Sequence, residues 1–216
     1  MTTFFVTGTD TEIGKTMVTA CLAAGWRARG KNPKAIKPLA TGSEPPGEDA
    51  LFLAQAAGHP PKVFACLPLP ASPERAAREA NVSIDDISLV EWVRSQVGDP
   101  VLIEGVGGWA VPLTESMTVE DLAMAIKAPV LVVADNKLGV INHTLLTVEA
   151  VRGCGLPIAG IIINHCSKEK ISLHQWNILD IKRWVGIDTP VAMLPHIEDP
   201  SALSDVGLAL LSDLGL

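Results

Sequence analysis

The chain has 216 residues, of which 48% are hydrophobic, a length and composition that suit a single domain over residues 1–216 with a buried sheet. Its formal net charge of −7, from 17 basic and 24 acidic residues, argues against a protein that binds a nucleic-acid backbone. The first residues lack the pattern of a signal peptide and no apolar run is long enough to span a bilayer, so we expect a cytoplasmic protein without membrane contact.

Short β-branched runs alternate with helical patterns along the chain, which is typical of βαβ units and a parallel sheet. In chain order the patterns predict a strand at 4–6, a helix ending at Gly30, a strand at 34–40, a helix from about Asp49, a helix from a capping-box-like Ser83 and Asp86 through Val93, a strand in the run PVLIE (100–104), a strand at 129–135, a helix over 144–152, strands at 158–164 and 191–195, and a C-terminal helix. Residues 59–82 are proline-punctuated and stay unassigned. The predicted fold is α/β, a doubly wound, mainly parallel sheet with helices on both faces, whose ligands gather at the carboxyl ends of the strands.

The segment FVTGTDTEIGKT, residues 5–16, resembles a phosphate-binding loop with one residue too many. The usual pattern is G-x-x-x-x-G-K-[ST], but here five residues separate Gly8 from Gly14. A strand before the loop and a helix after it favour a nucleotide site of the P-loop NTPase type. Lys15 would lie along the β- and γ-phosphates, and Thr16 would offer its hydroxyl to Mg²⁺. The alternative is a Gly-Lys-Thr sequence that only begins a helix.

Three charged residues are candidates for the same site. Glu104 ends an apolar strand before a glycine run, where a second metal-binding acid is expected, although a solvated acid at a strand end is the alternative. Lys37 lies late in a strand, where it faces either the ligand crevice or the solvent at a sheet edge, and the residues alone do not decide. Asp49 begins a helix and is most often an N-cap there.

Several polar residues have weaker signals. Asn164 ends a strand and could read adenine through N6 and N7, but a turn role is the simpler interpretation. The segment NKLGVINH, 136–143, places N–H groups at a helix start, where a carboxylate could bind or Asn142 could cap. His59, His174 and His196 show no metal spacing and are expected in surface or loop roles. The four cysteines lack C-x-x-C spacing and favour packed, reduced thiols.

Four stretches together, VTGTDTEIGKT, IKPLATGS, IEGVGGW and KLGVINH, strongly resemble the dethiobiotin synthetase family, and the similarity extends through IIIN and LPHI. The resemblance implies a ligase of biotin synthesis that uses ATP and Mg²⁺. It implies that 7,8-diaminononanoate and CO₂ form a carbamate, which is phosphorylated to a carbamic–phosphoric anhydride and closes the ureido ring of dethiobiotin.

The resemblance also assigns residues. Its catalytic residues match Lys37, Lys15 and Thr11, and the metal site matches Thr16, Asp49 and Glu104. The nucleotide contacts match Glu12, Ile13, Gly14, Lys15, Thr16, Met17, Asp49, Glu104, Gly105, Val106, Gly107, Asn164, His165, Pro195, His196 and Ile197. The substrate contacts match Thr41 and, from the partner of a homodimer, Leu138, Gly139, Val140, Ile141 and Asn142.

Two departures from the family pattern affect the substrate site. Thr41 stands where serine is expected, which keeps the hydroxyl. The family often presents a tyrosine to the substrate carboxylate, and this chain has no tyrosine. Trp176 falls near the equivalent place and offers a single N–H donor. The stretch from Thr41 to Asp49 is also short for the family.

Two other functions would use the same loop. A nucleotide switch of the partitioning-ATPase type usually carries an extra lysine inside the loop, whereas residues 9–13 include Asp10 and Glu12 and no lysine. A cobyrinate-type amide ligase would explain the nucleotide motifs but not IKPLATGS together with KLGVINH.

Overall fold

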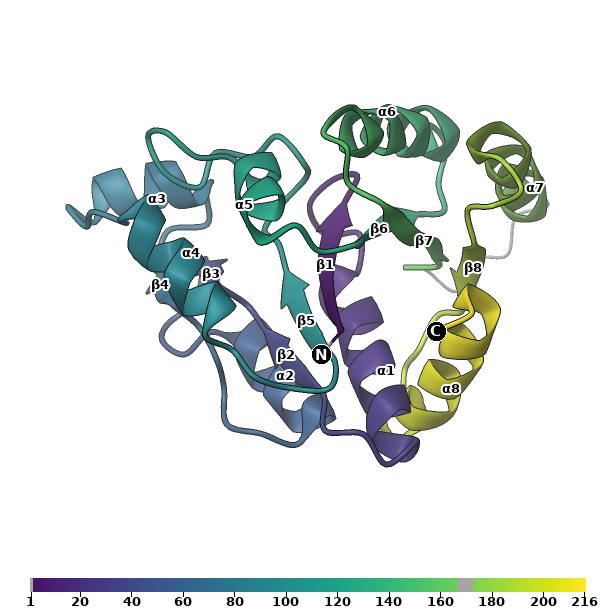
Figure 1. The fold of residues 1–216 in the computed structure, drawn as a ribbon, viewed down its shortest axis with the longest axis horizontal. Helices are drawn as coiled ribbons and strands as arrows, with labels where there is room; N and C mark the ends of the chain where they lie inside the picture. Colours follow the sequence, from purple (N-terminus) through teal and green to yellow (C-terminus); the bar gives the residue numbers. More distant parts are fainter. Residues whose placement is uncertain (1, 167–172) are drawn as a thin grey trace.

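The structure is a computed structural model that describes residues 2–166 and 173–216. The described residues form a six-stranded sheet in the order β2-β5-β1-β6-β7-β8, and every neighbouring pair of strands is parallel (Figure 1). Its strands are β1 (Thr3–Gly8), β2 (Lys34–Ile36), β5 (Val101–Glu104), β6 (Val130–Asp135), β7 (Ile158–Asn164) and β8 (Val191–Leu194). The order reverses direction beside β1, so the expected crevice lies at the carboxyl end of that strand.

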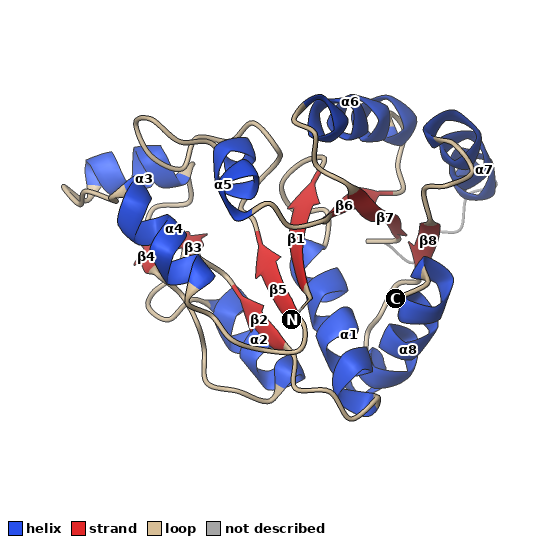
Figure 2. Ribbon diagram, in the orientation of Figure 1, coloured by secondary structure: helices blue, strands red, loops and turns tan. Residues whose placement is uncertain are grey.

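Helices cover both faces of this sheet, as predicted (Figure 2). They are α1 (Lys15–Ala28), α2 (Glu48–Ala57), α3 (Pro73–Glu79), α4 (Asp86–Arg94), α5 (Val119–Ile126), α6 (Val140–Gly153), α7 (Leu173–Val185) and α8 (Leu203–Leu214), with a 3-10 turn at Pro200–Ala202. Because successive side chains of a strand point to opposite faces, β1 contributes Phe4 and Val6 to one core and Phe5 to the other. The first core packs α1, α2 and α8, and the second packs α4, α5, α6 and α7.

The predicted strand at 34–40 is wrong in one respect, because it is two strands. β2 ends at Ile36, and the chain leaves the sheet at Lys37 and Pro38 before β3 (Leu39–Thr41) begins. β3 pairs with β4 (Ala65–Leu67) in a separate two-stranded parallel sheet. Proline cannot donate to a strand ladder, and the Lys37 ammonium is bound by the carboxylates of Asp49 and Glu104. β4 and α3 both come from the stretch that the sequence left unassigned.

The N-caps of three helices differ from expectation. α4 is capped by Asp85, whose carboxylate accepts from the Ser88 N–H at 2.7 Å, and not by Ser83. α6 begins at Val140, four residues early, after a Gly139 N-cap with φ +94°, so Asn142 lies in the first turn and is not the cap. α2 begins after Gly47, and Asp49 is its second residue. In each case a residue nearby in the chain is the N-cap.

None of the described helices is long and apolar enough to cross a membrane. The four cysteines are unpaired, and Cys21 is buried in the core. The side chain of His174, expected in a surface or loop role, lies outside the described residues.

Candidate active site

The phosphate-binding loop connects β1 to α1. Gly14 caps α1 with φ +83°, and Glu12 also has a positive φ of 54°, a conformation that is uncommon outside glycine. Gly8 packs closely against the loop, because a Cβ there would lie 2.6 Å from Ile13 Cδ1 and would displace that side chain. The widened loop is therefore folded tightly over the buried Ile13 side chain, and it presents the start of α1 to the crevice.

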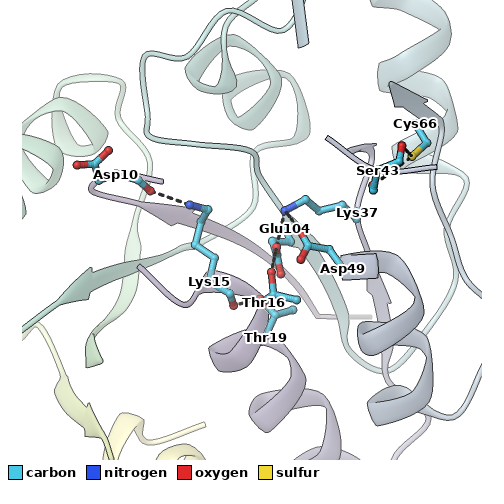
Figure 3. A network of polar contacts seen from close by, with 9 residues as sticks. All are labelled: Asp10, Lys15, Thr16, Thr19, Lys37, Ser43, Asp49, Cys66 and Glu104. Carbon is cyan, nitrogen blue, oxygen red and sulfur yellow. Dashed lines mark hydrogen bonds and ion pairs between the residues drawn. The ribbon is translucent and has the colours of Figure 1, made fainter. Parts of the chain in front are cut away.

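Lys15 reaches back over this loop. Its Nζ donates to the main-chain oxygen of Asp10 at 2.7 Å (Figure 3). Burial, reinforced by the nearby charge of Lys37, lowers the pKa of the Lys15 ammonium to about 8. A phosphate group bound in the loop would supply the negative charge that this buried cation lacks.

Lys37 lies just beyond β2 and is buried, with 4% of its surface exposed. Its Nζ is 2.6 Å from Glu104 Oε1 and 2.9 Å from Asp49 Oδ2 (Figure 3). Burial alone would lower the pKa of Lys37, but the two carboxylates outweigh it, so its pKa is raised and the side chain stays charged. Of the two interpretations of Lys37 that the sequence left open, the structure selects the crevice.

Glu104, Thr16 and Asp49 converge from three elements, as the predicted metal site requires. The Thr16 hydroxyl donates to Glu104 Oε1 at 2.8 Å. Burial by itself would raise the pKa of Asp49, but the Lys37 ammonium outweighs it and holds that pKa below its usual value. Asp49 is thus an ionised partner of Lys37, and the alternative interpretation of it as an N-cap is wrong.

The oxygens of this cluster fit Mg²⁺. Glu104 is fully buried, and its Oε2 has no hydrogen-bond partner among the described residues. A buried carboxylate oxygen without a partner is costly unless a cation meets it. Within the described ranges no group of three or more His, Cys, Asp or Glu could hold a metal by itself. Mg²⁺ does not need such a cage, since it commonly takes one or two carboxylates and completes its shell with water and substrate phosphates.

A cavity of about 720 Å³ opens in front of this cluster. It is lined by Thr11, Glu12, Gly14, Lys15, Thr16, Lys37, Thr41, Asp49, Pro70, Ala71, Ser72, Pro73, Val106, Gly107 and Val111. The volume falls within the range of small-molecule sites in proteins. The predicted catalytic residues and Thr41 therefore share one cavity.

Two parts of the lining were missed from the sequence, residues 70–73 and Val111. The first lies in the unassigned proline-rich stretch. Ser72 followed by Pro73 is a signal for a helix start, and Ser72 does accept from the Arg75 N–H at 3.4 Å to begin α3. That signal could have predicted where α3 begins, but not that residues 70–73 line the same cavity as the phosphate-binding loop.

A second group of predicted residues lies at the carboxyl ends of β7 and β8. Asn164 is paired in register with Leu194, and the His165 N–H donates to the Leu194 carbonyl at 3.0 Å. Pro195, His196 and Ile197 follow directly in the chain. Asn164 is 3% exposed, and its Nδ2 donates to the main-chain oxygen of Ile13 at 2.9 Å. This group therefore adjoins the phosphate loop.

The predicted contacts to the substrate carboxylate do not line the cavity. Leu138 is 95% exposed in the turn before α6, and Trp176 is 60% exposed on α7. Residues 138–142 and Trp176 are all absent from the cavity wall. Within one chain, this end of the predicted substrate site is not assembled.

A parallel sheet whose first strand enters a glycine loop, with a lysine and a threonine opening the next helix, defines a P-loop nucleotide-binding protein. The fold resembles that of the cell division ATPase MinD from Pyrococcus furiosus, with a TM-score of 0.60 at 17% identity over 99% of this chain and 97% of that one. It also resembles the septum site-determining protein MinD from Pyrococcus horikoshii OT3 in complex with Mg-ADP, with a TM-score of 0.58 at 15% identity over 99% and 93% of the two chains.

Sequence comparison defines the family more narrowly. A family model described as an AAA domain matches residues 2–203. The chain is 39% identical over 202 residues to the ATP-dependent dethiobiotin synthetase BioD of Anaeromyxobacter sp. (strain Fw109-5), covering 90% of each sequence. It is 42% identical over 174 residues to that of Xanthomonas oryzae pv. oryzae (strain PXO99A), covering 74% and 77%. The chain belongs to the family of ATP-dependent dethiobiotin synthetases, and it is therefore a ligase of biotin synthesis.

Proposed function

We propose that the protein closes the ureido ring of dethiobiotin from 7,8-diaminononanoate and CO₂ with the consumption of ATP. The observation that carries this proposal is the shared cavity, which is lined by Lys15, Lys37, Thr11 and Thr41. A reaction that joins a small anion to a γ-phosphate needs cations at both groups and donors that hold the anion in line.

The proposed reaction has three steps. One amine of the diamine adds to CO₂ and loses a proton, which gives a carbamate. A carbamate oxygen attacks the γ-phosphorus while the bond to the bridging oxygen of ADP breaks, which gives a carbamic–phosphoric anhydride. The second amine attacks the carbamoyl carbon and loses a proton. The C–O bond of the anhydride breaks, phosphate leaves with that oxygen and its electron pair, and the five-membered urea closes.

The roles of the chain's own residues follow from their positions. Lys15, at the start of α1, would bind the β- and γ-phosphates. Lys37 would lie between carbamate and γ-phosphate, where it offsets the charge of both. Thr11 and Thr41, which line the cavity, would donate hydrogen bonds to the carbamate. Bound Mg²⁺, held by Thr16, Asp49 and Glu104, would offset the charge of the transferred phosphoryl group.

The nucleoside end is proposed at the carboxyl ends of β7 and β8. Glu12 through Met17 and Glu104 through Gly107 would contact the phosphates and ribose. Asn164, His165 and residues 195–197 would surround the base. This placement is supported by the hydrogen bond from Asn164, at the end of β7, to Ile13 in the phosphate-binding loop.

We further propose a homodimer in which the partner completes the substrate site. The turn 138–142 would meet the substrate carboxylate of the neighbouring subunit through the N–H groups at the start of α6, with Trp176 nearby. Two observations support this arrangement. These residues do not line the cavity of their own chain, and the large apolar side chains of Leu138, Leu146, Trp176 and Leu179 are exposed.

An assay with diaminononanoate, bicarbonate, Mg²⁺ and ATP tests the function. Phosphate release should depend on the diamine, and a product with the mass of dethiobiotin should accumulate with it. Phosphate release at the same rate without the diamine would instead favour a nucleotide switch and would contradict the proposal.

A further inference from the structure

The carboxamide of Asn164 is held under the phosphate-binding loop. One hydrogen of its Nδ2 is directed to the main-chain oxygen of Ile13 at 2.9 Å, and Nδ2 also donates to Cys166 Sγ at 3.1 Å. A carboxamide nitrogen carries two hydrogens. One of them is therefore used by the loop, and the other meets only a thiol sulfur, which is a weak acceptor. The side chain is 3% exposed.

The loop touches this carboxamide closely. A Cβ at Gly14 would lie 2.0 Å from Asn164 Nδ2, so only glycine leaves room for the contact. Gly14 is also the N-cap of α1, with φ +83°. The Asn164 amide thus packs against the turn that presents the N–H groups of α1 to a phosphate.

The other end of the contact is rigid. Asn164 is the last residue of β7 and is paired in register with Asp135 of β6 and Leu194 of β8. Its own carbonyl accepts from the Asn136 N–H at 2.8 Å. The Ile13 side chain is buried in the core below α1. The loop is therefore anchored twice at Ile13, by the side chain in the core and by the carbonyl on the sheet.

This geometry gives Asn164 a role at the loop in addition to the proposed contact with the base. A bidentate pair with N6 and N7 needs one carboxamide donor and one acceptor. The bond to the Ile13 carbonyl leaves Oδ1 and the second Nδ2 hydrogen for a base. We propose that Asn164 is a positioning residue that fixes the phosphate-binding loop through the Ile13 carbonyl, so that it supports triphosphate binding whatever base the ligand carries. The inference rests on the proposed use of ATP by this loop.

Calorimetry with two ligands tests the inference. Asn164→Ala should weaken Mg-tripolyphosphate on the order of tenfold, as expected for one buried hydrogen bond, and Mg-ATP at least as much. Weaker ATP binding with tripolyphosphate binding as in the wild type would make Asn164 a base-reading residue and overturn the proposal. If the wild-type protein bound neither ligand, the proposed function itself would fail.

Hydrogen exchange gives a second readout that needs no ligand. In Asn164→Ala the amides of residues 9–16 should exchange faster than in the wild type, while those of β6 and β8 keep their protection. Unchanged exchange in the loop would also overturn the proposal. Asn164→Ser, which is too short to reach Ile13 but keeps a polar group in the buried site, replaces the alanine variant if that variant does not fold.

Asn81→Ala is a control for a general loss of stability. Asn81 is exposed beyond α3 and has a positive φ of 54°, which alanine disfavours. This variant should be less stable than the wild type and yet bind both ligands as the wild type does. Weaker ligand binding in Asn81→Ala would show that stability alone explains the effect.

Discussion

Lys37 is bound by two carboxylates at once, and these are two of the three proposed ligands of Mg²⁺. The lysine thus neutralises the site when it holds no metal. A metal ion at Asp49 and Glu104 would compete with the ammonium for the same oxygens and turn it toward the cavity, where the carbamate is proposed to form. Lys37 would then serve both as a counter-ion and as a catalytic cation.

Replacement of Lys37 by glutamine tests both roles. We expect Lys37→Gln to lose diamine-dependent turnover while it retains most of its affinity for ATP. Without nucleotide it should bind Mn²⁺, measured by electron paramagnetic resonance, at least about tenfold more tightly, because one competing positive charge is gone. Mn²⁺ binding that is unchanged or weaker would contradict competition between lysine and metal. Lys31→Gln, at an exposed ion pair with Asp99, is the matched control.

The crossing of α1 and α8 depends on two glycines. A Cβ at Gly207 would lie 2.0 Å from the Cys21 carbonyl oxygen, and one at Gly25 would lie 2.5 Å from the Gly207 carbonyl carbon. The backbones of the two helices therefore touch, and α1 is the helix that carries Lys15 and Thr16. The packing of α8 contributes in this way to the position of the phosphate-binding residues.

Gly207→Ala should lower the free energy of unfolding by about 2 kcal/mol through overpacking, despite the ~1 kcal/mol that alanine gains over glycine inside a helix. Gly153→Ala is the matched control, because a Cβ at Gly153, the last residue of α6, meets nothing within 4 Å. That control should be neutral or stabilising by less than ~1 kcal/mol. Urea denaturation measures the free energy of unfolding of both variants. An equal change in Gly207→Ala and Gly153→Ala would contradict the close crossing of the two helices.

The edge strand β2 is attached to the loop after α2 by His59. The Ala35 N–H donates to His59 Nε2 at 3.0 Å, so Nδ1 carries the proton and donates to the Pro60 carbonyl at 2.7 Å. Burial lowers the pKa of His59 below its usual 6.5, and the charges of Lys34 and Lys62 act in the same direction. The folded protein thus favours the neutral ring.

The free energy of unfolding should therefore decrease as the pH is lowered through the acidic range. Because the unfolded chain binds the proton more readily, the stabilisation is complete above pH ~6.5 and is lost as the pH falls through the lower pKa of the folded state. Since His59 is only half-buried, we expect less than about 1 kcal/mol. Unfolding of His59→Gln, which keeps an acceptor but does not titrate, should depend less on pH between 7.5 and 5 than that of the wild type. An identical slope would refute this role, and His143→Gln, on the exposed face of α6, controls for the loss of an imidazole.

In the folded chain the residues of the proposed substrate site lie in two separate regions. Lys37 lies in the cavity, whereas Asn142 lies at the start of α6 outside its wall. If a second copy brings its turn to this cavity, each active site needs residues of both chains. The exposed apolar residues of α6 and α7 give such an interface a surface to bury.

Mixed dimers test this division. A Lys37→Gln chain and an Asn142→Asp chain, whose added negative charge would repel the substrate carboxylate, should each be nearly inactive. A mixture should regain roughly a quarter of wild-type activity, because half of randomly formed dimers are mixed and each has one intact site of two. Native mass spectrometry would verify the mixed dimers. Activity that does not recover in dimers shown to be mixed would place each site within one chain.

The sequence by itself determined those features that depend on local patterns. The alternation of strands and helices predicted the parallel sheet with two covered faces. The order of Gly8, Gly14, Lys15 and Thr16 predicted the phosphate-binding loop. Glu104 was identified from its place at a strand end before a glycine run. These signals are readable because each is encoded within a few consecutive residues.

Only the tertiary structure decided which distant residues meet. Lys37 and Glu104 are 67 positions apart, and Asn164 is 151 positions from Ile13. Local patterns do not specify which strands become neighbours, so the sequence left Lys37 undecided, placed β3 in the wrong sheet and gave no role to residues 70–73. Pairing in the folded chain turned a lysine at a strand end into a buried counter-ion and a strand-ending asparagine into the support of the phosphate loop.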